Sequence, residues 1–187
     1  MALSRLFIIL SFLIGSNITT FASYIFIPMN EDQTDHLKAY GLDYWVLEQG
    51  AETWWLLNYE GGSFVLPNST SIEKECKARG VSYKVISDAA FNSILTTIND
   101  PENNMEAIKM EKAPRIAVYT PTVNERGEEI NPWDDAVTLV LTYAEIPFDK
   151  VYDREIIEGK LTKYDWLHLH HEDFTGQYGK FYSNFRG

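Results

Sequence analysis

The second half of the chain alternates short apolar runs with helical segments, and this order permits few folds. Buried-type strands are predicted at residues 115–121, 148–152 and 164–170. A helix at residues 131–146 and a helical turn at 155–160 separate these strands. Because strands connected through helices pair in parallel, the pattern predicts a βαβαβ unit of a doubly wound, flavodoxin-like sheet with right-handed crossovers.

The sequence after residue 170 predicts no further strand before it ends at Gly187. A parallel sheet of three strands would leave an exposed edge and a thin core. We therefore expect the sheet to be incomplete and the chain to be the N-terminal part of a longer protein.

The first half is expected to be a mixed α/β segment. A polar stretch with two prolines, residues 99–114, is predicted to separate the segments 23–112 and 113–187. The pair Gly61-Gly62 either forms a hairpin turn or lets the backbone approach a ligand, and the hairpin is the simpler interpretation. The predicted elements are helices at 32–48, 69–79 and 88–98, a strand at 81–86, and a hairpin of strands 54–58 and 63–67.

The N-terminus has the layout of a cleavable signal peptide. Arg5 precedes an apolar run at residues 6–14. The small residues Thr20 and Ala22 occupy the two positions before the cleavage site that a signal peptidase recognises. Cleavage after Ala22 and export to the periplasm or cell envelope are predicted. A single-pass anchor is the alternative, but the run is shorter than the ~20 residues that span a bilayer, and no transmembrane segment is predicted after cleavage.

Composition limits the partners and the source of stability. Cys76 is the single cysteine, so no intramolecular disulfide can form and the fold must depend on its hydrophobic core, for which 45% of the residues are hydrophobic. The formal net charge of −11 and the lack of clustered Lys and Arg predict no binding to nucleic acid or to an anionic membrane. An unknown small molecule or an envelope component is the expected partner.

Three of the four histidines and two acids gather at the end of the last predicted strand, as His168, His170, His171, Glu172 and Asp173. Ligands bind at that end of the strands in open α/β sheets. His168, His170 and His171 could hold a divalent metal such as zinc, although their spacing matches no established zinc motif. Alternatively, His170 or His171 could act in acid–base catalysis with Glu172 or Asp173, or the histidines could be structural.

The loop after the first parallel strand, residues 120–132, offers further polar groups. In a flavodoxin-like strand order, Thr122, Asn124 and Arg126 would line a ligand crevice beside the histidines. The alternative is a long solvated loop without a binding role.

Two other groups of residues have a structural and a functional interpretation. Cys76 stands in the middle of a predicted helix, which favours a structural thiol over a nucleophile. The aromatic residues Trp45, Trp54, Trp55 and Tyr59 could form a carbohydrate-stacking platform, but their spacing favours core positions.

Residues 55–64 (WLLNYEGGSF) and 164–178 (YDWLHLHHEDFTGQY) resemble segments of exported bacterial proteins labelled asparagine synthetase B. The second half is also similar in layout to class I glutamine amidotransferase-like domains. The resemblance implies a flavodoxin-like fold, a chain that continues beyond residue 187, and amide-nitrogen chemistry. The nucleophilic cysteine of those amidotransferases follows a strand at a tight elbow, and this sequence has no cysteine at the matching place. A genuine asparagine synthetase also carries a phosphate-binding loop, and this sequence has no such loop.

Two hypotheses about function follow. The first is an exported envelope protein with an amidotransferase-like domain and a binding or scaffold role. The second is an enzyme, either a hydrolase or a glutamine-dependent amide-transfer enzyme, that acts through residues 168–173 with or without a metal.

Overall fold

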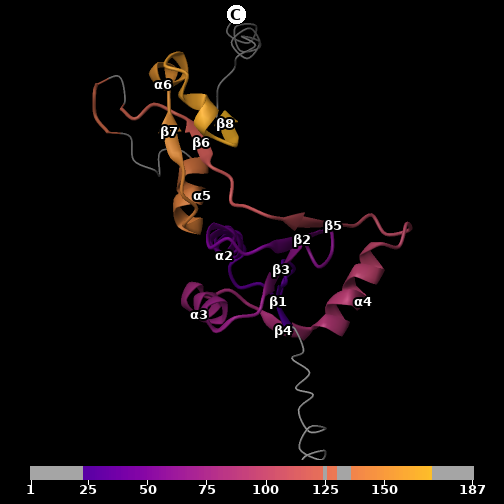
Figure 1. Ribbon diagram of the computed structural model, residues 1–187. Coiled ribbons are helices and arrows are strands. Elements are labelled where there is room, and N and C mark those ends of the chain that lie inside the picture. Colours follow the sequence, from indigo (N-terminus) through magenta and orange to yellow (C-terminus); the bar gives the residue numbers. More distant parts are fainter. Residues whose placement is uncertain (1–22, 124–125, 130–135, 170–187) are drawn as a thin grey trace, which may run out of the picture.

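The computed structural model describes residues 23–123, 126–129 and 136–169, which form a mixed α/β structure. One sheet has five antiparallel strands and the other has three parallel strands (Figure 1). The mixed α/β class is therefore confirmed. The predicted signal peptide and its cleavage site, as well as the predicted start of the helix at 131–146, lie outside the described residues.

The first half of the chain builds the antiparallel sheet. Its strands lie in the order β4-β1-β3-β2-β5, and β2 and β3 form the predicted hairpin, in which Trp55 is opposite Phe64. The strands are β1 (Ser23–Ile27), β2 (Thr53–Leu57), β3 (Ser63–Pro67), β4 (Lys84–Ser87) and β5 (Glu106–Met110).

Three helices cover the two faces of this sheet, namely α2 (His36–Glu48), α3 (Thr70–Arg79) and α4 (Asp88–Ile98). α2 and α3 lie on one face and α4 lies on the other (Figure 1). The side chains of Asp35, Ser69 and Ser87 cap the three helices by accepting backbone N–H groups. A large apolar cluster fills the space under α2 and α3, and a smaller one lies under α4.

The sequence pattern does not predict two of the strands. β1 is short and apolar and directly follows the predicted cleavage site, but it lies inside the sheet between β3 and β4. β5 lies within the stretch predicted as a boundary, and its polar sequence suits an edge strand with several exposed residues. The strand predicted at 81–86 begins at Lys84, because Val81 continues the end of α3 by donating its N–H to the Cys76 carbonyl at 2.8 Å.

The hairpin turn explains the glycine pair. Gly61 has a φ of 82°, and a Cβ atom there would lie 2.3 Å from the carbonyl oxygen of Met29. The backbone that approaches Gly61 thus belongs to the chain itself, which favours the hairpin interpretation over a ligand contact.

The second half of the chain builds the parallel sheet, in the order β7-β6-β8. Its core is small, with buried Ile116, Val118 and Leu141. The predicted helical turn at 155–160 is replaced by two short elements, α6 and a 3₁₀ helix, with Gly159 between them in the left-handed region at φ 75°. The elements are β6 (Ile116–Tyr119), α5 (Ala136–Ala144), β7 (Asp149–Val151), α6 (Asp153–Ile157), η2 (Lys160–Lys163) and β8 (Trp166–Leu169).

The two sheets meet where α5 packs against α2 (Figure 1). A Cβ atom on Gly41 would lie 1.7 Å from the carbonyl oxygen of Ala144, so the helices approach this closely because residue 41 has no side chain. Glu145, just after α5, lies 2.6 Å from Lys38 Nζ of α2 and 2.9 Å from Arg79 Nη1 of α3. α5 is thereby held against both helices of one face.

Candidate functional site

The predicted histidine site is described only in part. His168 lies in β8 opposite Val118 of β6, half-buried, and its ring packs edge-on against Trp166 at 6.3 Å between centroids. The other predicted residues, His170, His171, Glu172 and Asp173, lie outside the described residues. Within the described ranges, no group of three or more His, Cys, Asp or Glu side chains is arranged to hold a metal ion, and the zinc site remains a prediction.

The predicted crevice loop begins at the same edge of the sheet at which β8 ends. Tyr119 pairs with Leu169, so the loop with Thr122 and Arg126 leaves the carboxyl edge next to the end of β8. Asn124 lies outside the described residues. At the same edge, a hydrogen bond connects the end of β6 to the start of α6, because the Tyr119 hydroxyl donates to Asp153 Oδ1 at 2.5 Å.

The lone cysteine sits in the larger core. Cys76 belongs to α3 and is fully buried against the sheet, and burial raises the pKa of its thiol to about 11. A thiol with so high a pKa is a poor nucleophile near neutral pH. The structure therefore agrees with the structural interpretation of this residue.

The four aromatic residues considered as a carbohydrate platform are divided between the two faces of the antiparallel sheet. Trp45 and Trp55 pack against the cluster under α2 and α3, whereas Trp54 and Tyr59 pack against the cluster under α4. Neighbouring residues of a strand point to opposite faces, which separates Trp54 from Trp55. These four side chains therefore do not form one stacking surface.

An apolar groove of about 450 Å³ lies where the two halves of the chain meet. One wall of the groove is formed by α2, and a second wall by residues of β2, β3 and β5. The remaining wall comes from the second half of the chain, with residues of β6, α5 and β8. Its aromatic lining consists of Tyr40, Tyr44, Trp55, Phe64 and Trp166. Both the size and the apolar lining are those of small-molecule sites.

Several contacts between the lining residues hold the groove in shape. The rings of Trp55 and Phe64 stack with 6.3 Å between centroids and 21° between planes, and Tyr40 meets Phe64 edge-on at 5.3 Å. The Tyr44 hydroxyl donates to the carbonyl oxygen of Pro114 at 2.8 Å, which connects α2 to the segment between the sheets. These contacts fix the walls of the groove where the two halves of the chain meet.

One carboxylic acid, Asp43 of α2, stands in this apolar lining. Only 5% of Asp43 is exposed, and within the described ranges its Oδ1 atom has no hydrogen-bond partner. Burial raises the pKa of Asp43 to about 7, and the nearby Thr53 hydroxyl opposes this rise only in part. Asp43 therefore exchanges a proton near neutral pH, which is unusual for a carboxyl group.

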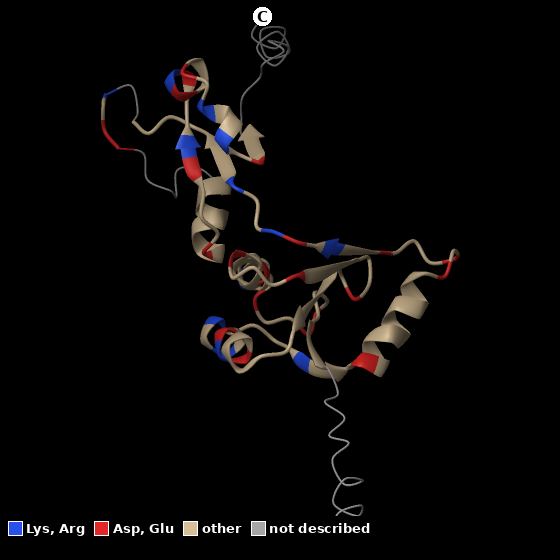
Figure 2. Ribbon diagram, in the orientation of Figure 1, with Lys and Arg blue, Asp and Glu red and all other residues tan. Residues whose placement is uncertain are grey.

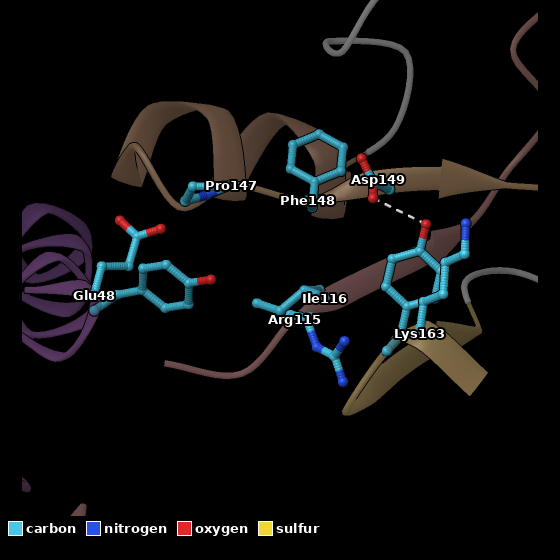
Figure 3. A pocket seen from close by; sticks show the side chains of 9 residues that line it. Glu48, Arg115, Ile116, Pro147, Phe148, Asp149 and Lys163 are labelled. Carbon is cyan, nitrogen blue, oxygen red and sulfur yellow. Dashed lines mark hydrogen bonds between the residues drawn. The ribbon is translucent and has the colours of Figure 1, made fainter. Parts of the chain in front are cut away.

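A second, more polar pocket of about 440 Å³ adjoins the groove and shares Tyr44 and Ile116 with it. Glu48 of α2 lies on one side and Lys163 on the other, and the Tyr164 hydroxyl donates to Asp149 Oδ2 at 2.9 Å (Figure 3). This pocket lies at the amino ends of the parallel strands, the edge at which open α/β sheets do not usually bind ligands. The apolar groove is the better candidate site.

Sequence reasoning missed both the groove and Asp43. The groove forms between segments that are far apart in the chain, and no local pattern reports such a junction. A signal for Asp43 was present, because it is a single acid within the otherwise apolar or aromatic run 39–47 of a helix. A charged residue in a run that packs on one side against a core is a candidate for a buried polar role.

No family model, no curated protein and no solved structure matches this chain. In the described part of the chain, none of the helices has the length and apolar character needed to cross a membrane.

Proposed function

We propose that this chain is an exported cell-envelope protein that binds a small molecule in the apolar groove. The observation that carries the proposal is a preformed groove of about 450 Å³ with five aromatic side chains and one buried carboxyl group. Binding pockets typically combine an apolar lining with a few placed polar groups. The N-terminal residues 1–22, with their signal-peptide layout, are the support for export.

For the second half we propose a flavodoxin-like, amidotransferase-like fold without the catalytic thiol of that class. In its favour, the strands are parallel and lie in the order β7-β6-β8, so the first strand of the unit is in the middle. The buried Cys76 belongs to the other half of the chain. A shared fold does not imply a shared reaction, so the binding role is compatible with this fold.

The enzyme hypothesis, a hydrolase or amide-transfer reaction at residues 168–173, rests on the sequence alone. Of its residues, the structure describes His168, whose ring packs on Trp166. We therefore favour the binding role.

The test is binding of the neutral dye Nile red by the mature chain, followed by fluorescence. Val140 and Leu139 are adjacent in α5 and are each 40% exposed, but Val140 lines the groove and Leu139 does not. We expect Val140→Lys to lower the affinity for the dye at least tenfold, because a charged side chain would enter the apolar lining. Leu139→Lys is the matched control and should bind like the wild-type chain.

Equal binding by the wild-type chain and both variants would show that the dye binds elsewhere and would overturn the proposal. Circular dichroism of both variants at the assay temperature would establish that they are folded to the same extent.

A further inference from the structure

We propose that the groove selects a small molecule with a flat aromatic body and one primary ammonium group, and that Asp43 binds this ammonium group. The inference rests on the proposed binding function and adds the chemical class of the ligand to it.

The Asp43 carboxyl group is in a state that favours a cationic partner. It is nearly completely buried, it lines the groove, and within the described ranges its Oδ1 atom is without a hydrogen-bond partner. A buried acceptor without a partner is destabilising, and burying one charge is tolerated best when an opposite charge comes beside it. An ammonium group in the groove would supply both a hydrogen bond and that opposite charge.

The described residues around Asp43 in the groove include no cationic side chain. The titratable side chains that line the groove with Asp43 are Tyr40 and Tyr44, both from α2. β2, β3, β5, β6, α5 and β8 contribute Trp55, Phe64, Met110, Ile116, Trp166 and aliphatic residues of α5, and none of these carries a charge. Thr53 of β2 is the uncharged polar neighbour of Asp43, and its side chain offsets the rise of the Asp43 pKa only in part. Among the described residues that line the groove, no Lys, Arg or His side chain competes with a cationic ligand for Asp43.

The overall charge of the protein also favours a cationic ligand. Lys and Arg residues are interspersed with Asp and Glu over both halves of the described chain (Figure 2), and the formal net charge is −11. A negative protein attracts cationic ligands and repels anionic ones of the same size.

The aromatic side chains in the walls of the groove favour a ligand with a flat aromatic ring. Trp55 and Phe64 present a stacked pair, and Trp166 of β8 stands 48% exposed on the side of the second half. Flat rings stack on such side chains in offset or edge-on arrangements. An aromatic amine would place its ring among these residues and its ammonium group beside the carboxyl group on α2.

Binding should release protons. Near neutral pH, part of the Asp43 carboxyl population is protonated, and an ammonium ion binds best to the ionised form. When the amine binds, the carboxyl proton passes to solvent while the ligand keeps its own charge. The affinity for an amine should therefore rise as the pH increases from 6 to 8, whereas the affinity for a neutral analogue should not.

The experiment compares tryptamine with tryptophol, which have the same indole body but end in an ammonium and a hydroxyl group. Isothermal titration calorimetry at pH 6 and pH 8 would measure both with the wild-type chain, Asp43→Asn and Val140→Lys. For the wild-type chain we expect tryptamine to bind at least tenfold more tightly than tryptophol at pH 8, with a smaller ratio at pH 6. In Asp43→Asn the ratio should fall close to one at both pH values.

The outcomes separate the two proposals. If tryptophol binds as tightly as tryptamine, or if Asp43→Asn leaves their ratio unchanged, the assignment of Asp43 is overturned while the groove remains a binding site. If neither compound binds and Val140→Lys does not alter Nile red binding, the groove itself is overturned. Thermal unfolding of Asp43→Asn checks that a loss of affinity does not reflect a loss of fold.

Discussion

The two sheets of this chain are stabilised in different ways. The antiparallel sheet is covered by helices on both faces, and its two clusters contain eleven and five buried residues. The cluster of the parallel sheet contains three, and its partly buried neighbours include Tyr44 from α2. The comparison indicates that the antiparallel half has its own core, whereas the parallel half, over its described residues, depends on its contact with α2. The groove is formed at this contact, so the ligand site and the weaker half should be coupled.

The largest effect on stability is expected from adding a side chain where α2 and α5 are in contact. In Gly41→Ala the new methyl group would overlap the carbonyl oxygen of Ala144, so α5 would have to move away from α2. We expect the free energy of unfolding to fall by about 3 kcal/mol, as for overpacked core positions. Urea denaturation would measure this change.

Gly50→Ala is the control for that variant. Gly50 has a φ of 78° and open space around it, so the substitution introduces backbone strain without a steric overlap. Its cost should be about 1 kcal/mol. Equal losses in both variants would contradict the close approach of α2 and α5 as the cause.

A smaller effect of opposite sign is expected from Asp43→Asn. The folded-state pKa of Asp43 is about 7, above its ordinary value of 3.8, so the folded state retains a proton that the unfolded state releases between these pH values. Stability from this group is present below about pH 4 and is lost as the pH rises toward 7. We therefore expect Asp43→Asn to be more stable than the wild-type chain by roughly 2 kcal/mol at pH 8 and by little at pH 4. Thermal unfolding at both pH values would show whether the difference has this sign.

The smallest effect is expected from Asp165→Asn, which acts at the start of β8. Asp165 accepts hydrogen bonds from Arg115 Nε at 3.1 Å, from the backbone N–H of Arg115 at 2.9 Å and from Lys112 Nζ at 2.9 Å. These bonds hold the pKa of Asp165 below its ordinary value. A lowered pKa stabilises the fold above about pH 4, and that stability is lost on acidification. Asp165→Asn should therefore destabilise the chain at pH 7 by less than Asp43→Asn stabilises it. An unchanged unfolding midpoint would mean that the connection between the sheets does not depend on this group.

The sequence predicted the elements that local chemistry determines. The hairpin around Gly61-Gly62 and the helix that ends at Gly80 follow from turn and cap residues, and the structure confirms both. β5 has no such signal, because it is a polar edge strand whose pairing with β2 depends on residues more than forty positions away. The groove is unpredictable for the same reason, since Trp55, Val140 and Trp166 line it from segments that lie far apart in the sequence.

The most direct test of this account is the titration of the Asp43 carboxyl carbon by ¹³C nuclear magnetic resonance, with Asp43→Asn used to assign the signal. We expect a midpoint near pH 7 in the free chain and a lower midpoint in the presence of tryptamine. A midpoint near pH 4 in the free chain would mean that water reaches the carboxyl group, and this would contradict an apolar groove built around a buried acid.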